Sequence, residues 1–202
     1  MTDLRALLSA FGRIVEVPAE VYVAGSSQER VRCRAVMDAL KAEPSCALTY
    51  DWLADIEANG GVANAGLSAF QQRRARIACL NAVKTCDLFV FLVPHAQTRG
   101  AWVELGYALH MCKPIWIGGL SDDAKQTIFL GPRDDAEIRA FGEHARFLVS
   151  TPQAALDENI GQVERARIIA EAQSEADSLL LKYLIAWADL AATLQARSSE
   201  VR

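Results

Sequence analysis

The element that decides the fold lies at residues 98–108, TRGAWVELGYA, just after an apolar run at 88–93. Trp102, Leu105 and Leu109 recur at the spacing of one helix face, which predicts a helix over 99–111. The run at 88–93, LFVFLV, contains no polar residue, as is typical of a parallel strand covered on both faces. A buried strand followed by a helix is the repeating unit of a parallel α/β sheet.

Strand and helix patterns alternate on both sides of this pair. Ser26, three residues before Glu29, predicts a capping box where the first of these helices begins. The alternation predicts a doubly wound parallel sheet of the flavodoxin-like or Rossmann-like α/β class. Further strands are predicted at 20–24, 46–52, 114–118 and 147–149, with helices at 28–42 and 70–85 and a loop at 56–65.

The chain divides into three expected segments. Residues 1–19 hold an N-terminal helix and linker, 20–156 form the α/β domain, and 157–202 form a long helix or helical hairpin. The last segment carries an apolar stripe that is too long for a small domain to cover, so we expect a homo-oligomer, most simply a dimer. The alternative is that it docks on the chain's own sheet. The stripe comprises Ile169, Ala176, Leu180, Tyr183, Trp187, Leu190 and Leu194.

The composition excludes several classes of protein. A net charge of −4 argues against a broad nucleic-acid-binding surface. No basic-then-apolar leader and no apolar run of membrane-spanning length is present, so we expect a cytoplasmic protein. The five cysteines are scattered, and with three histidines they show no metal-ligand spacing, which indicates buried free thiols and no metal site.

Glu104 is the most informative single residue. From 100 to 111 it is the only side chain certain to be charged at neutral pH, and Ala101 and Ala108 lie one turn away on either side. A carboxylate between small residues, near the start of a helix that follows a strand, has room for a ligand against it. The alternative is a solvated helix glutamate near the favourable N-terminal dipole.

Three motifs in a fixed order resemble the nucleoside 2-deoxyribosyltransferase superfamily over about residues 20–150. They are VELGYAL at 103–109 followed by Lys113-Pro114, the opening VYVAGS at 21–26, and the turn AVKTCD at 82–87. The resemblance implies that the glutamate at 104 attacks the anomeric carbon of a nucleoside or nucleotide. A glycosyl-enzyme ester forms, and water or a second base resolves it without a metal or cofactor.

Two positions depart from the transferase pattern. An aspartate of the transferases falls at Thr98 here, and a further family aspartate falls at Cys79. A small hydroxyl residue at the first position is typical of the branch that cleaves nucleotide 5′-monophosphates. The resemblance therefore favours a nucleotide N-glycosidase whose substrate is a small-molecule nucleotide.

The carboxyl ends of parallel strands share one edge, and other candidate site residues fall there. The turn Gly25-Ser26-Ser27 with Arg30 is expected to hold a phosphate, or else is an ordinary capped turn. Asp51 is a candidate to orient Glu104 or contact a ribose hydroxyl. The remaining candidates are Tyr107 beside Glu104, Trp52 as a base-stacking or core residue, and Thr98, Arg99 and Gly100 as substrate contacts or a helix cap.

Two other functions stay open on the sequence. NAD hydrolases of the TIR type also place a glutamate on a helix after a buried strand. A non-catalytic domain that senses a nucleotide and signals through its C-terminal helix would explain the two absent carboxylates. Asp87, at the start of a buried strand, is expected to fix a turn rather than act in chemistry.

Overall fold

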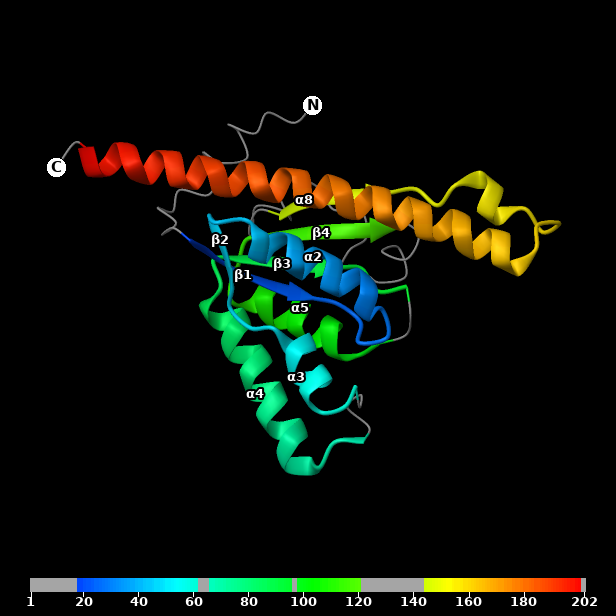
Figure 1. The fold of residues 1–202 in the computed structure, drawn as a ribbon, viewed down its shortest axis with the longest axis horizontal. Coiled ribbons are helices and arrows are strands. Elements are labelled where there is room, and N and C mark those ends of the chain that lie inside the picture. The colour runs from blue at the N-terminus through cyan, green and yellow to red at the C-terminus, as the bar shows by residue number, and fades with distance from the viewer. Residues whose placement is uncertain (1–17, 62–65, 96–97, 121–143, 201–202) are drawn as a thin grey trace.

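The sheet has five parallel strands in the order β2-β1-β3-β4-β5 (Figure 1). The computed structural model describes residues 18–61, 66–95, 98–120 and 144–200, so the helix expected within 1–19 lies mostly outside it. This order is that of the flavodoxin-like sheet, and it confirms the doubly wound α/β class. The strands are β1 (Ala19–Ala24), β2 (Cys46–Leu48), β3 (Leu88–Leu92), β4 (Ile115–Leu120) and β5 (His144–Val149).

Helices cover both faces of the sheet. α2 (Arg30–Ala42) and α8 (Gln162–Glu200) pack on one face, and α4 (Ala69–Thr85) and α5 (Gly100–His110) on the other (Figure 1). Successive residues of a strand point to opposite faces, so Val21 and Val23 of β1 join the first core while Tyr22 joins the second. No described helix is long and apolar enough to span a membrane.

The C-terminal segment is a single helix, not a hairpin. α8 is 39 residues long, and five residues spaced four apart are buried: Ala172, Ala176, Leu180, Leu184 and Ala188. The last three of them belong to the core beside the sheet. A Cβ atom added at Gly118 of β4 would lie 3.0 Å from Leu180 Cδ2, so the glycine permits the close approach. The middle of the stripe is therefore covered within the chain, while the side chains of Trp187, Leu190 and Leu194 lie outside the described ones.

Two local predictions were wrong. The capping box predicted at Ser26 does not form, because α2 begins at Arg30 and the Ser26 hydroxyl accepts the Gln28 N–H instead. A capping box does occur at the start of α4, between Ser68 and Gln71.

The second strand is also shorter than predicted. β2 ends at Leu48, and α3 (Trp52–Ala58) replaces the end of the expected strand and the start of the expected loop. The carboxylate of Asp51 accepts the Ala54 N–H at 3.0 Å, and aspartate at such a position favours the start of a helix.

Candidate functional site

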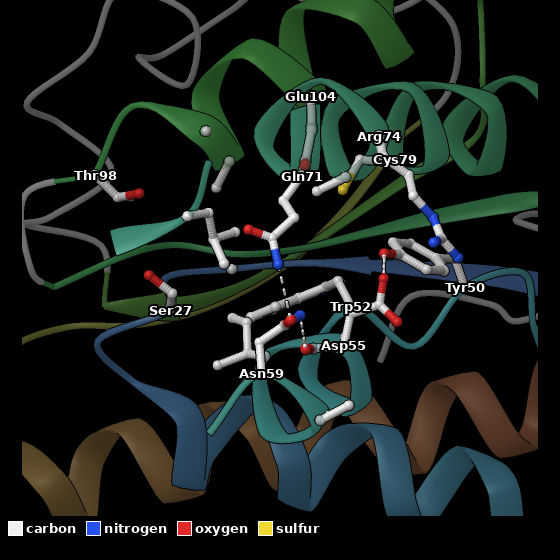
Figure 2. A pocket seen from close by; sticks show the side chains of 17 residues that line it. Ser27, Tyr50, Trp52, Asp55, Asn59, Gln71, Arg74, Cys79, Thr98 and Glu104 are labelled. Atoms are coloured by element: carbon white, nitrogen blue, oxygen red, sulfur yellow. Dashed lines mark hydrogen bonds between the residues drawn. The ribbon is translucent and has the colours of Figure 1, made fainter. Parts of the chain in front are cut away.

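A cavity of about 350 Å³ lies beyond the carboxyl ends of the strands, between α3, α4 and α5. Six of the predicted site residues line it: Gly25, Ser27, Trp52, Thr98, Gly100 and Glu104. Figure 2 shows Glu104 over the middle of the cavity, with Ser27 and Thr98 toward one end and Tyr50 and Arg74 toward the other. The topological rule for open α/β sheets thus places these residues together.

Three predicted residues are held by structural contacts outside the cavity lining. Ser26 is buried and its hydroxyl accepts the Gln28 N–H. Arg30 donates from Nε to the Ser27 carbonyl at 3.1 Å and from Nη2 to the Gly61 carbonyl at 2.9 Å. Asp51 pairs with Arg34 and Lys41 and caps α3; these contacts hold its pKa at about 2 despite partial burial.

The last two predicted residues also lie off the cavity wall. Arg99 is exposed at the N-cap of α5, and Tyr107 packs half-buried against the core between α4, α5 and the sheet. Tyr107 follows Glu104 by three residues, yet the α5 face that it occupies packs on the core. The structure therefore does not bring Asp51 or Tyr107 to Glu104.

Burial dominates the electrostatics of Glu104. It raises the pKa of the carboxyl from its ordinary 4.5 to about 7, while hydrogen bonding from the Tyr22 hydroxyl and then from the Cys79 thiol acts in the opposite direction. No described cation forms an ion pair with it. A buried carboxyl without a counter-charge is partly ionised near neutral pH, which is the range that acid, base or nucleophilic chemistry requires.

Two side chains lie beside this carboxyl: Tyr22 on β1 and Cys79 on α4. The Tyr22 hydroxyl is fully buried beside Glu104 and Cys79, and it forms no regular hydrogen bond with a described residue. Burial and the charge of Glu104 raise the pKa of Cys79 to about 12, so this thiol stays protonated. Both groups can therefore donate to an ionised Glu104.

Trp52 is a core residue that also forms part of the cavity wall. Its indole nitrogen donates to the Val23 carbonyl at 2.8 Å, and its ring packs against both hydrophobic cores. The same side chain forms part of the cavity wall. The anchored ring therefore gives the cavity a rigid aromatic surface.

Sequence reasoning missed the end of the cavity built by α3 and α4. Tyr50 donates a short hydrogen bond to Asp55, and the Gln71 amide donates to Asn59 Oδ1 at 3.3 Å across the two helices (Figure 2). Arg74 also lines this end. Asp51 as a helix cap, followed by Asp55 and Asn59 at spacings of four, favours a helix here, whereas the pattern of apolar residues predicts the end of a strand and a loop.

The N-terminus of α5 opens toward the other end of the cavity. Gly100 and Ala101 line the cavity, and no side chain caps the first turn of this 11-residue helix in the described structure. Such a turn presents unpaired N–H groups and the positive end of the helix dipole. Among the described residues, no group of histidine, cysteine and acidic side chains could hold a metal ion.

No protein-family model and no curated protein matches this sequence. Among solved structures, the chain is similar to the CMP N-glycosidase BcmB of Clostridium botulinum, with 17% identity, a TM-score of 0.42, and coverage of 65% of this chain and 87% of that chain. It is also similar to BlsM, with 14% identity, a TM-score of 0.47, and coverage of 81% and 94%. Both TM-scores lie below 0.5, so the functional proposal rests on the site itself.

Proposed function

We propose that the protein hydrolyses the N-glycosidic bond of a nucleotide, with Glu104 as the nucleophile. One observation carries this proposal: a partly buried carboxyl with a pKa of about 7 and no described cationic partner faces an aromatic-walled cavity. Burial is unfavourable for a charged carboxylate, so a group retained there without compensation indicates a chemical role rather than a structural one.

The reaction proceeds in two displacements. An oxygen of the Glu104 carboxylate bonds to the anomeric carbon while the bond to the base nitrogen breaks, and the bonding pair leaves with the base, which takes a proton from water. Water then attacks the anomeric carbon of the glycosyl ester, loses a proton, and releases the sugar phosphate and the free carboxylate. The balance consumes one water molecule and needs no other reactant.

The cavity suggests the orientation of the substrate. Ser27, Thr98 and the uncapped N-terminus of α5 offer hydroxyl and N–H donors suited to a 5′-phosphate. The opposite end has the aromatic rings of Tyr50 and Trp52 and the guanidinium of Arg74, which suit a stacked base. Glu104 lies between the two ends, where the sugar would be. Ser26 and Arg30 are not part of this proposal.

The cavity size favours a mononucleotide. At about 350 Å³ it is near the lower end of ligand cavities, which span roughly 300–1,000 Å³. A dinucleotide such as NAD would have to extend out of it. NAD cleavage is therefore an alternative outcome of the experiment rather than a second proposal.

The experiment is incubation of the full chain with nucleosides, their 5′-monophosphates and NAD, with the released base followed by chromatography. We expect monophosphates to be cleaved with a kcat/KM at least about tenfold above that of the matching nucleosides, because charge-assisted hydrogen bonds hold the phosphate. Ser27→Ala with Thr98→Val should raise KM for the monophosphate and leave the nucleoside unaffected. Glu57→Gln, on the exposed side of α3, is the matched control.

The outcomes separate the candidates. Absence of base release from every substrate would overturn the proposed hydrolysis. Binding of a nucleotide without cleavage would favour a sensor, and cleavage of NAD alone would favour an NAD hydrolase.

A further inference from the structure

Arg32 of α2 reaches the carboxyl ends of two central strands. Its Nη1 donates to the Val93 carbonyl at 2.8 Å and its Nη2 to the Gly118 carbonyl at 3.3 Å. These carbonyls follow β3 and lie within β4, on the edge of the sheet where the cavity opens. The guanidinium thus holds the backbone at the point where the chain leaves β3.

Asp177 of α8 holds this guanidinium in place. Its two oxygens accept from Arg32 Nε at 2.8 Å and from Nη2 at 3.0 Å, and the two side chains are only 13% and 11% exposed. α8 brings Asp177 to this position because Ala176 is buried beside it and Leu180 packs on Gly118. Two parallel hydrogen bonds fix the plane of a guanidinium, so Nη1 stays directed at Val93.

Glu29 forms a second contact with the residues that follow β3. Its carboxylate accepts the His95 N–H at 3.3 Å from each oxygen, and it lies 3.7 Å from Arg32 Nη1. The carbonyl of Val93 and the N–H of His95 are therefore both bound from the α2 and α8 face of the sheet. A few residues further along the chain come Thr98 and Gly100, which line the cavity on the opposite face.

We propose that Asp177 and Arg32 are positioning residues, through which α8 sets the geometry of the segment after β3 and of the substrate-binding wall at Thr98 and Gly100. This inference rests on the proposed function. Neither residue lines the cavity, so neither acts on the reacting atoms. Their effect comes through placement: catalysis requires the phosphate contacts and Glu104 to be in register, and displacements of about 1 Å can lower rates by about a hundredfold.

The test compares Asp177→Asn with Leu184→Ala in the full chain. Asparagine offers one oxygen acceptor, so it keeps the volume but loses one of the two hydrogen bonds to Arg32. Leu184 is buried two turns further along α8 and has no part in the ion pair. We expect Asp177→Asn to lower kcat/KM for a 5′-monophosphate by about tenfold or more, mainly through KM, and Leu184→Ala to change it by less than about twofold.

Amide hydrogen exchange supplies a readout that does not depend on turnover. The His95 N–H should exchange faster in Asp177→Asn than in the wild type, and at the wild-type rate in Leu184→Ala. Should Asp177→Asn fail to fold, the double variant Arg32→Met with Asp177→Leu replaces it, because exchanging both partners for apolar residues leaves no buried charge unpaired. The same changes in KM and exchange are then expected.

The proposal is overturned if the His95 amide exchanges at the wild-type rate in Asp177→Asn, or if Leu184→Ala loses as much kcat/KM as Asp177→Asn. If the wild type releases no base from any nucleotide, the proposed hydrolysis fails by itself. The positioning role is then decided by the exchange of the His95 amide alone, so the two failures remain distinguishable.

Discussion

Each face of the sheet has a carboxyl group that is shielded from solvent, and the two groups have different partners. Asp177, between α8 and α2, meets the guanidinium of Arg32 in a bidentate pair. Glu104, between α5 and α4, meets a hydroxyl and a thiol, from Tyr22 and Cys79. The first carboxylate is compensated by an opposite charge; the second is partly desolvated without one.

The difference separates a structural carboxylate from a reactive one. A compensated buried pair stays ionised and keeps two elements in a fixed relation, as Asp177 does for α8. An uncompensated buried carboxyl has a raised pKa and is poorly solvated, so it responds to a substrate and to pH. We therefore propose that the α4 and α5 face carries the chemistry and that the α2 and α8 face supports it.

The largest expected effect is on turnover. Glu104→Gln removes the proposed nucleophile and should lower base release by at least about a thousandfold, with the circular dichroism spectrum unchanged. Glu57→Gln, which alters an exposed glutamate of α3, should keep full activity. Retention of more than about a tenth of the wild-type rate by Glu104→Gln, a loss of less than ~1.4 kcal/mol, would contradict the assignment of the nucleophile.

Asp177→Ala tests how much the ion pair of Asp177 with Arg32 contributes to the free energy of unfolding. It removes the bidentate partner of the largely buried Arg32 and leaves it the more distant Glu29 carboxylate at 3.7 Å, so we expect the free energy of unfolding to fall by about 3 kcal/mol in urea titrations. Arg32→Met with Asp177→Leu should recover most of this loss, because no charge is then buried. Equal losses in the single and double variants would mean that packing, and not charge compensation, dominates at this face.

Glu104→Gln should also stabilise the protein at alkaline pH. The folded-state pKa of Glu104 is raised to about 7 from 4.5, so the stability that its protonated form contributes is fully present below pH 4.5 and is lost as the pH rises through 7. At pH 8.5 the glutamine variant should therefore be more stable than the wild type by about 3 kcal/mol. At pH 4.5 the two should be equal, and a constant difference across this range would refute the buried, uncompensated state.

Tyr22→Phe should produce a smaller shift in the pH profile of kcat/KM. Hydrogen bonding from Tyr22 lowers the pKa of Glu104, so its removal should raise the acid limb from near pH 7 by about half a pH unit. Phe91, a buried aromatic residue on the same sheet face, gives the matched control, since Phe91→Leu alters packing without removing a hydroxyl. An acid limb that moves in the control but not in Tyr22→Phe would exclude Tyr22 as a partner of Glu104.

The smallest expected effect concerns the oligomeric state of the protein in solution. Leu180, Leu184 and Ala188 of α8 are buried in the core beside the sheet, and the helix continues to Glu200 beyond the sheet (Figure 1). We still expect a doubled mass in light scattering at micromolar concentration, through pairing of the part of α8 beyond Ala188. A chain that ends after Ala188 should then be a monomer. A monomeric full-length chain would show that α8 serves only its own sheet.

The sequence by itself determined the strand and helix alternation and the isolation of Glu104 on its helix. These features depend on periodicity and on nearest neighbours along the chain. The Glu20 N–H donates to Asp87 Oδ2 at 2.9 Å, so Asp87 has a structural contact, but this contact links the starts of β1 and β3 and does not close the predicted local turn. In a parallel sheet the carboxyl ends of the strands lie at one edge. This rule predicts the location of six of the residues that line the cavity.

Only the tertiary structure decided which side chains turn toward the cavity. Ser26 and Asp51 lie near the correct edge but satisfy local backbone and ionic partners. Asp55 lines the cavity from a helix that the sequence pattern does not predict, and Arg74 lines it from a predicted helix whose packing against the sheet the pattern does not specify. The pairing of Arg32 with Asp177 joins residues 145 positions apart. Contacts of this kind follow from how helices pack on the sheet, and local periodicity carries no information about them.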